Sequence, residues 1–171
     1  IYQYGSGDWY KNGNMRKKRS KKLPDKHATI DNGAATNQLH FLLHPYRLNK
    51  QGEPIKGSIK KGLEFLLKLK LDIGGWPQVY PKDGSYKGQS TYNDNPIVNI
   101  MVALHSVFAG PNKGVVEAKI DKKSKEAYEK ILRYIRYSQI KQDGVRTAWC
   151  QQYSTKKMKC VKGRSYELPG I

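Results

Sequence analysis

The sequence predicts an all-α protein built of helical hairpins, with long irregular loops at one end. Two observations lead to this prediction. Apolar residues recur at spacings of three and four in four stretches of the chain, as expected for helices that bury one face. Several of these stretches are joined by short connections, which favour antiparallel neighbours. Hairpins arranged around one axis would bring the longer loops together, and binding sites usually lie on such loops.

Start and stop signals set the limits of the four stretches. Asp31 and Asn32 stand where the first helix would begin, and both residue types are common N-caps. Asp94 and Asn95 precede Pro96 in the same way, and proline is favoured at the first helical position. The expected helices cover residues 34–49, 56–71, 96–109 and 116–141.

The strongest compositional feature is positive charge. Lys and Arg number 32 against 14 Asp and Glu, which gives a formal net charge of +18. Such a field attracts nucleic acids, anionic membranes and acidic polysaccharides. The lysines are dispersed, and a purely solvating surface explains their number equally well. No apolar run approaches the about 18 residues of a membrane helix, and no nucleic-acid-reading motif stands out. We therefore expect neither a membrane nor a nucleic acid as partner.

The two cysteines, Cys150 and Cys160, leave two alternatives open. They could close a single bridge in a secreted protein, where a short loop gives modest stabilisation. They could also be two free thiols. We favour free thiols, because two cysteines do not make a disulfide framework.

Three segments, residues 29–33, 91–95 and 163–169, combine acids, amides and an arginine in expected loops. Capping alone explains Asp31 and Asp94, but it does not require the neighbouring asparagines. Clusters of side-chain oxygens suit Ca²⁺, which takes 6–8 oxygen ligands in flexible geometry. His40 and His44 have a spacing seen in helical metal sites, and we interpret them as ordinary surface histidines of a helix.

Five segments in order resemble the pectate lyases of polysaccharide lyase family 10, and the resemblance covers essentially the whole chain. These segments read ATIDNGA, GGWPQVYP, TYNDNPIVNIM, QIKQDGVRTAWCQQ and RSYELPG. The resemblance implies an (α/α) toroid and a secreted enzyme. It also implies Ca²⁺-dependent cleavage of polygalacturonate by β-elimination, with 4,5-unsaturated products.

The resemblance also assigns residues. Asp31, Asn32 and Asp94 resemble the site for calcium and the substrate carboxylate, and Arg164 resembles the catalytic arginine. Arginine binds carboxylates more often than it acts as a base, so that use of Arg164 stays open. We assign six residues to substrate binding, from the cleft-shaping Trp-Pro-Gln segment, the Trp-Cys-x-Gln segment and the basic surface: Asn32, Trp76, Tyr80, Lys82, Trp149 and Gln151.

The sequence departs from the family pattern in ways that keep a second function open. Gln89, Ser90 and Tyr153 occupy regions where the family usually has histidines. Family members also extend beyond both ends of this chain. We therefore expect residues 1–171 to form one catalytic domain, a monomer that is a fragment or has an abbreviated toroid. The alternative is a catalytically weakened pectate-binding module of the same fold.

Overall fold

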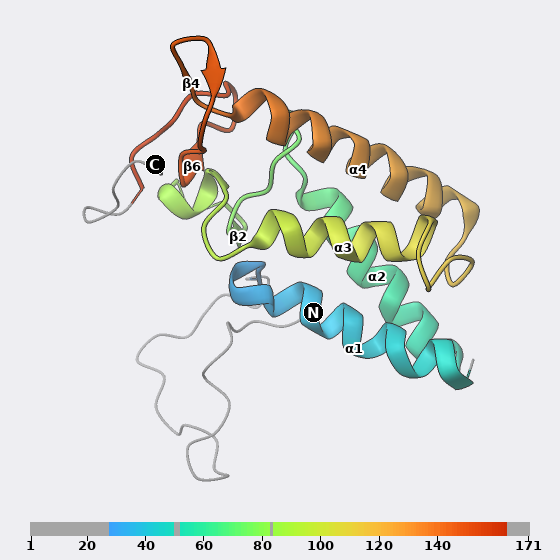
Figure 1. Cartoon of the computed structure of the whole chain (residues 1–171). Helices are drawn as coiled ribbons and strands as arrows, with labels where there is room; N and C mark the ends of the chain where they lie inside the picture. Colours follow the sequence, from blue (N-terminus) through green and yellow to red (C-terminus); the bar gives the residue numbers. More distant parts are fainter. Residues whose placement is uncertain (1–27, 50–51, 83, 164–171) are drawn as a thin grey trace, which may run out of the picture.

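A computed structural model describes residues 28–49, 52–82 and 84–163, and in these ranges the chain is mainly helical (Figure 1). The helices are α1 (Ala34–Asn49), α2 (Glu53–Leu69), α3 (Pro96–Phe108) and α4 (Ala118–Ser138). The prediction of a helical protein is therefore confirmed, with the first and third helices close to their expected limits.

The second and fourth helices differ slightly from the prediction. Helix α2 begins earlier than expected, because Pro54 lies in its first turn and follows Gly52, whose φ of 91° suits glycine. Proline at that position starts a helix rather than breaking one. Helix α4 ends at Ser138, because the next residue, Gln139, has an extended backbone.

Helix α3 lies at the centre of the helical body, between α1 and α4 (Figure 1). Its buried face carries Ile97, Ile100 and Leu104, each at most 1% exposed. Helix α2 packs against both α1 and α4, and its buried stripe of Ile59 and Leu63 joins the same core. No helix in the described ranges is both long and apolar enough to span a bilayer.

Three two-stranded antiparallel sheets lie beside the helices in the described ranges, and two isolated bridges extend their pairing. Strand β1 (Ala28–Thr29) pairs with β2 (Val79–Tyr80), β3 (Ser90–Thr91) with β6 (Gln152–Tyr153), and β4 (Lys141–Gln142) with β5 (Val145–Arg146). The bridges Pro77↔Ser90 and Tyr153↔Cys160 extend the pairing, so segments from distant parts of the chain lie side by side. The expected gathering of loops at one end of the helices is confirmed (Figure 1).

These paired strands and bridges, with the loops that carry them, form the loop layer of the molecule. Its close approach to α4 depends on two glycines. Gly74 has φ +97°, and a Cβ on it would lie 2.9 Å from the carbonyl oxygen of Lys130. Gly75 lies against Ser90 and Tyr134. The hydroxyls of these two residues are 2.7 Å apart and buried. A larger residue at either glycine would separate the loops from the helix.

The prediction of two free thiols is wrong, because Cys150 and Cys160 form a disulfide with a Cα–Cα distance of 5.7 Å. The backbone explains the pairing. The Cys150 N–H donates to the Tyr153 hydroxyl (2.8 Å), and Cys160 is bridged to the backbone of Tyr153. Tyr153 therefore holds both cysteines within the short range that a disulfide needs.

Replacing Tyr134 with Phe is expected to lower the free energy of unfolding by about 1–3 kcal/mol, because the buried Ser90 hydroxyl loses its partner. The double variant Tyr134→Phe/Ser90→Ala should lose less than the sum of the two single variants, since neither polar group is then left alone. Urea unfolding followed by circular dichroism measures these losses. Strictly additive losses would show that the two hydroxyls do not stabilise each other.

Candidate functional site

The two predicted acids lie at the same end of the molecule. Asp31 belongs to the short 3-10 helix η1 (Asp31–Gly33), which packs against α1 and α3, and Asp94 lies two residues before α3. Both helices begin at the loop end in Figure 1. Asn32, Asp94 and Asn95 have φ values of 48°, 63° and 59°. This left-handed conformation is uncommon outside glycine, and Asn and Asp tolerate it best.

The Asp31 carboxylate has an unusual environment. Its backbone N–H donates to the Thr29 hydroxyl (3.0 Å). Its Oδ1 atom is buried and has no hydrogen-bond partner among the residues that the structure describes. A carboxylate oxygen without donors is unfavourable in a buried position, and a cation or an external donor would relieve it.

A Ca²⁺ site at Asp31, Asn32 and Asp94 stays a prediction, and it would need further ligands from elsewhere. Asp94 Oδ2 accepts a hydrogen bond from the Asn93 amide (2.7 Å), which orients that carboxylate. Among the described residues no cluster of three His, Cys, Asp or Glu side chains could hold a metal. Two carboxylates and the amide of Asn32 would leave positions for substrate and water, which Ca²⁺ accepts readily.

The predicted substrate contact by Trp76 is wrong. Trp76 is 0% exposed, and its indole N–H donates to the Leu66 carbonyl (2.8 Å). The two glycines before it let the chain turn, so the ring enters the core beside α2. Trp76 therefore fastens the loop layer to the helical body and cannot reach a ligand from this position.

Tyr80 and Lys82 lie at the end of the β1–β2 pair. Tyr80 is half-buried, its ring meets Phe65 edge-on at 5.8 Å, and the Lys68 ammonium lies 5.6 Å from its centroid. Lys82 is exposed. A substrate contact remains open to both residues, and these two assignments stay predictions.

Trp149 lies at the edge of an aromatic cluster. Its indole N–H donates to the Ile135 carbonyl (2.8 Å), and its ring lies 6.1 Å from Tyr92. Tyr92 stacks on Tyr134 at 5.5 Å and shares a 2.7 Å hydrogen bond with Ser138. Burial raises the pKa of both tyrosines well above the usual range. These phenols therefore stay protonated and serve the packing, while Trp149, only half-buried, remains a predicted contact.

In the Trp-Cys-x-Gln segment the predicted substrate contact is Gln151, but the motif spacing points to the next residue. Counting from Trp149 places Gln152, not Gln151, at the last position of the motif. The carbonyl of Gln151 accepts from the Tyr92 backbone N–H (2.8 Å). Gln152 is 1% exposed, and neither its amide nitrogen nor its amide oxygen has a protein partner. The motif spacing itself was the signal that could have identified it.

Gln78 repeats this feature on a neighbouring segment. It is also 1% exposed, with both amide atoms unpartnered. Thr91 pairs with Gln152, and Pro77 is bridged to Ser90. Because directly opposite residues of a sheet point to the same side, Thr91 and Gln152 share one face of the β3–β6 pair. The sequence motif includes Gln78 in its cleft-shaping segment, but neither Gln78 nor Gln152 is among the residues predicted to bind substrate.

Arg164, the predicted catalytic arginine, lies outside the described residues. Its role stays a prediction.

Comparison with known proteins decides the family. A family model described as pectic acid lyase matches residues 3–171. This chain belongs to the pectic acid lyase family. A search among curated proteins found no significant match.

Comparison with solved structures supports the same family. A family 10 polysaccharide lyase from Cellvibrio cellulosa superposes with a TM-score of 0.79 at 30% identity, covering 98% of this chain and 53% of that one. A mutant family 10 polysaccharide lyase from the same organism, in complex with trigalacturonic acid, gives a TM-score of 0.78 at 27% identity with the same coverage. The resemblance to family 10 is confirmed, and this chain spans about half the length of those structures.

The variant Gln152→Met is expected to raise the free energy of unfolding by about 1 kcal/mol, because it replaces an unpartnered buried amide with an apolar group of similar size. Gln142→Met, on exposed strand β4, is the control and should change stability little. Thermal and urea unfolding measure both. A clear loss of stability in Gln152→Met would show that the amide makes a stabilising contact in solution.

Proposed function

We propose that this chain forms part of a secreted pectate lyase that cleaves polygalacturonate by Ca²⁺-dependent β-elimination. The match to the pectic acid lyase family along residues 3–171 is the observation that carries the proposal. A structural relative bound to trigalacturonic acid supports the same substrate class. In this proposal the helical hairpins form an arc of an (α/α) toroid, with the loop layer at its binding end.

The reaction removes the C5 proton of a galacturonate and expels the oxygen on C4, leaving a 4,5 double bond. The C5 proton is weakly acidic, since the adjacent carboxylate is already anionic. A bound Ca²⁺ would withdraw charge from that carboxylate and stabilise the enolate-like transition state.

The chain's own residues would bind and orient the substrate. Asp31 and Asp94 would supply two negative ligands at the loop end, and the buried, unpartnered Oδ1 of Asp31 supports this role. The Asn32 amide would add an oxygen without adding repulsion against an anionic substrate. The net charge of +18 would draw in polygalacturonate from solution, and exposed Lys82 is suited to contact a uronate carboxylate.

Arg164 is the proposed base, on the resemblance of its segment to the family motif. A free guanidinium has a pKa above 12 and holds its proton. The role therefore requires nearby cations or burial to lower that pKa, and it predicts an alkaline optimum. The competing use is bidentate binding of a substrate carboxylate.

The variant Asp31→Asn is expected to reduce turnover of polygalacturonate more than about tenfold at fixed Ca²⁺, because it removes a metal-holding charge. Part of the loss should be recovered at higher Ca²⁺. Asp143→Asn is the matched control, since Asp143 lies in the exposed β4–β5 turn with φ 50°, which Asn also tolerates. The assay follows the ultraviolet absorbance of unsaturated uronates. Unchanged activity in Asp31→Asn, or full activity in a chelator, would overturn the calcium assignment.

The variant Arg164→Ala is expected to abolish product formation while leaving binding of polygalacturonate largely intact, as removal of a base should do. Arg133→Ala, an exposed arginine on α4, is the control. Steady-state kinetics across pH and equilibrium binding together decide between the two uses of Arg164. A rise in KM with kcat preserved would identify a carboxylate-binding arginine instead.

A catalytically weakened pectate-binding module is the second candidate. It would bind polygalacturonate with no unsaturated product from the unmodified chain, whatever the pH or Ca²⁺ concentration. The same absorbance and binding assays distinguish it from the lyase.

A further inference from the structure

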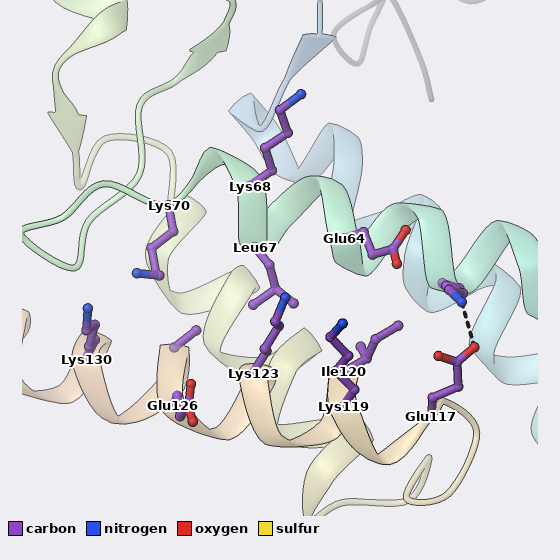
Figure 2. Close-up of a pocket in the computed structure, with 12 residues that line it drawn as sticks. Glu64, Leu67, Lys68, Lys70, Glu117, Lys119, Ile120, Lys123, Glu126 and Lys130 are labelled. Atoms are coloured by element: carbon purple, nitrogen blue, oxygen red, sulfur yellow. Dashed lines mark hydrogen bonds and ion pairs between the residues drawn. The ribbon is translucent and has the colours of Figure 1, made fainter.

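A groove of about 580 Å³ runs between α2 and α4 (Figure 2), and neither Asp31 nor Asp94 lines it. The facing sides of the two helices line it, and cations predominate on both. Six lysines line the groove: Lys60, Lys68, Lys70, Lys119, Lys123 and Lys130.

The groove has two ends of different character. At one end the Lys60 ammonium and the Glu117 carboxylate form an ion pair at 2.6 Å. At the other end Lys70, just after α2, points toward Lys130 on α4 (Figure 2). The two ends are about ten helical residues, or about 15 Å, apart. The groove is therefore long enough to follow an extended ligand.

Positive charge is only partly balanced in this groove. Glu64, Glu117 and Glu126 are the acids that line it, half as many as the lysines. In the described part of the chain, Lys60 alone among the six lysines lies within 4.0 Å of a carboxylate.

The Lys70–Lys130 end carries the least compensated charge. Partial burial and repulsion from Lys130 lower the pKa of Lys70, and the carboxylates of Asp72 and Glu126 offset this only in part. A negatively charged group bound between these two ammonium groups would relieve both the burial cost and the repulsion.

We propose that the groove between α2 and α4 is a second binding site for a carboxylate-bearing polysaccharide chain, separate from the site of cleavage. The identity of the polymer as polygalacturonate rests on the function proposed above. In this site the lysines bind uronate carboxylates, apart from Lys68, whose side chain points away from α4 (Figure 2) and whose ammonium lies over the Tyr80 ring. The glutamates accept hydrogen bonds from sugar hydroxyls. Half-buried Leu67 supplies an apolar contact for the face of a sugar ring, with the buried Ile120 and Ala127 beneath it.

The lining favours a uronate polymer over nucleic acid. None of the residues that line the groove is aromatic, so bases would find no stacking platform. All six cations are lysines, whereas paired phosphate oxygens are best bound by the arginine fork. The interspersed glutamates would repel a dense row of phosphates but tolerate carboxylates spaced one per sugar. The lining therefore favours a polyanion that has hydroxyl groups and carries its negative charges at intervals of one per sugar.

The groove is close enough to the loop end to hold a polymer near the proposed cleavage site. Lys130 lies against Gly74, and the chain continues from there through Trp76 into strand β2 at the loop end. A polymer held in the groove would keep its neighbouring segments close to the loops of Asp31 and Asp94. Such tethering raises the effective concentration of substrate without any new contact at the cleavage site.

The test compares two charge reversals on the same helix. Lys123→Glu/Lys130→Glu changes the groove, and Lys122→Glu/Lys125→Glu makes the same change in net charge at exposed positions that do not line it. Calorimetry measures binding of long polygalacturonate in the presence of EDTA, so that proposed Ca²⁺-dependent turnover cannot consume the polymer. Turnover of trigalacturonate with Ca²⁺ is measured separately, and circular dichroism confirms folding.

The groove variant should bind the polymer about tenfold more weakly, and the control about twofold at most, because exposed charges away from the ligand contribute little. Both variants should turn over trigalacturonate like the unmodified chain. Equal weakening in the two variants, or none in the groove variant, would overturn the groove site while leaving the proposed function intact. An unmodified chain that neither binds nor cleaves polygalacturonate would overturn both.

A third arm tests the class of polymer. Duplex DNA is titrated under the same conditions, and we expect Lys123→Glu/Lys130→Glu to weaken DNA binding no more than the control variant does. Tighter binding of DNA than of polygalacturonate, lost in the groove variant alone, would identify a nucleic-acid site instead.

Discussion

The buried contact between Ser90 and Tyr134 ties the loop layer to the helical body, and much of the candidate site depends on it. Tyr134 projects from α4, while Ser90 belongs to β3, which lies between the Pro77 and Tyr153 segments. Gly74 and Gly75 allow this approach, because the space a side chain would need is already filled. Short strands of two residues have little stability by themselves. Their positions are therefore set by this anchor, by the buried Trp76 and by the disulfide that closes the last segment.

The loop layer buries polar groups without hydrogen-bond partners, which lowers the stability of the fold. Asp31 Oδ1 and the amides of Gln78 and Gln152 are buried without protein partners. Native structures satisfy most buried polar groups, and exceptions often mark functional positions. Helix capping does not explain the polar residues at the start of α3, since its N-cap residue, Asn95, makes no side-chain capping hydrogen bond. These groups give the assignment to the pectic acid lyase family a physical counterpart at the loop end.

The lysines that give the chain its net charge of +18 differ in their surroundings. Many lysines lie on exposed helix faces, where solvation accounts for them. The groove between α2 and α4 differs, because Lys70 and Lys130 repel each other there and the lysines of its lining outnumber the glutamates two to one (Figure 2). In the two proposals, the loop end would cleave the polymer and the groove between α2 and α4 would hold it. Long-range attraction would serve both, and salt would weaken it.

The helices were determined by the sequence alone, because apolar spacing, Pro96 and the helix-breaking glycines act over a few residues. The family resemblance was equally local, since it rests on short motifs. Tertiary structure decided which motif residues are available to a ligand. Trp76 matches the motif but is buried in the core, whereas Gln152, which the sequence prediction does not name, is one of two described glutamines whose side-chain amides are buried without a partner. The cysteine pairing and the lysine groove were also decided in three dimensions. Burial, disulfide geometry and charge proximity depend on segments that meet only after folding, and no local pattern encodes those distances.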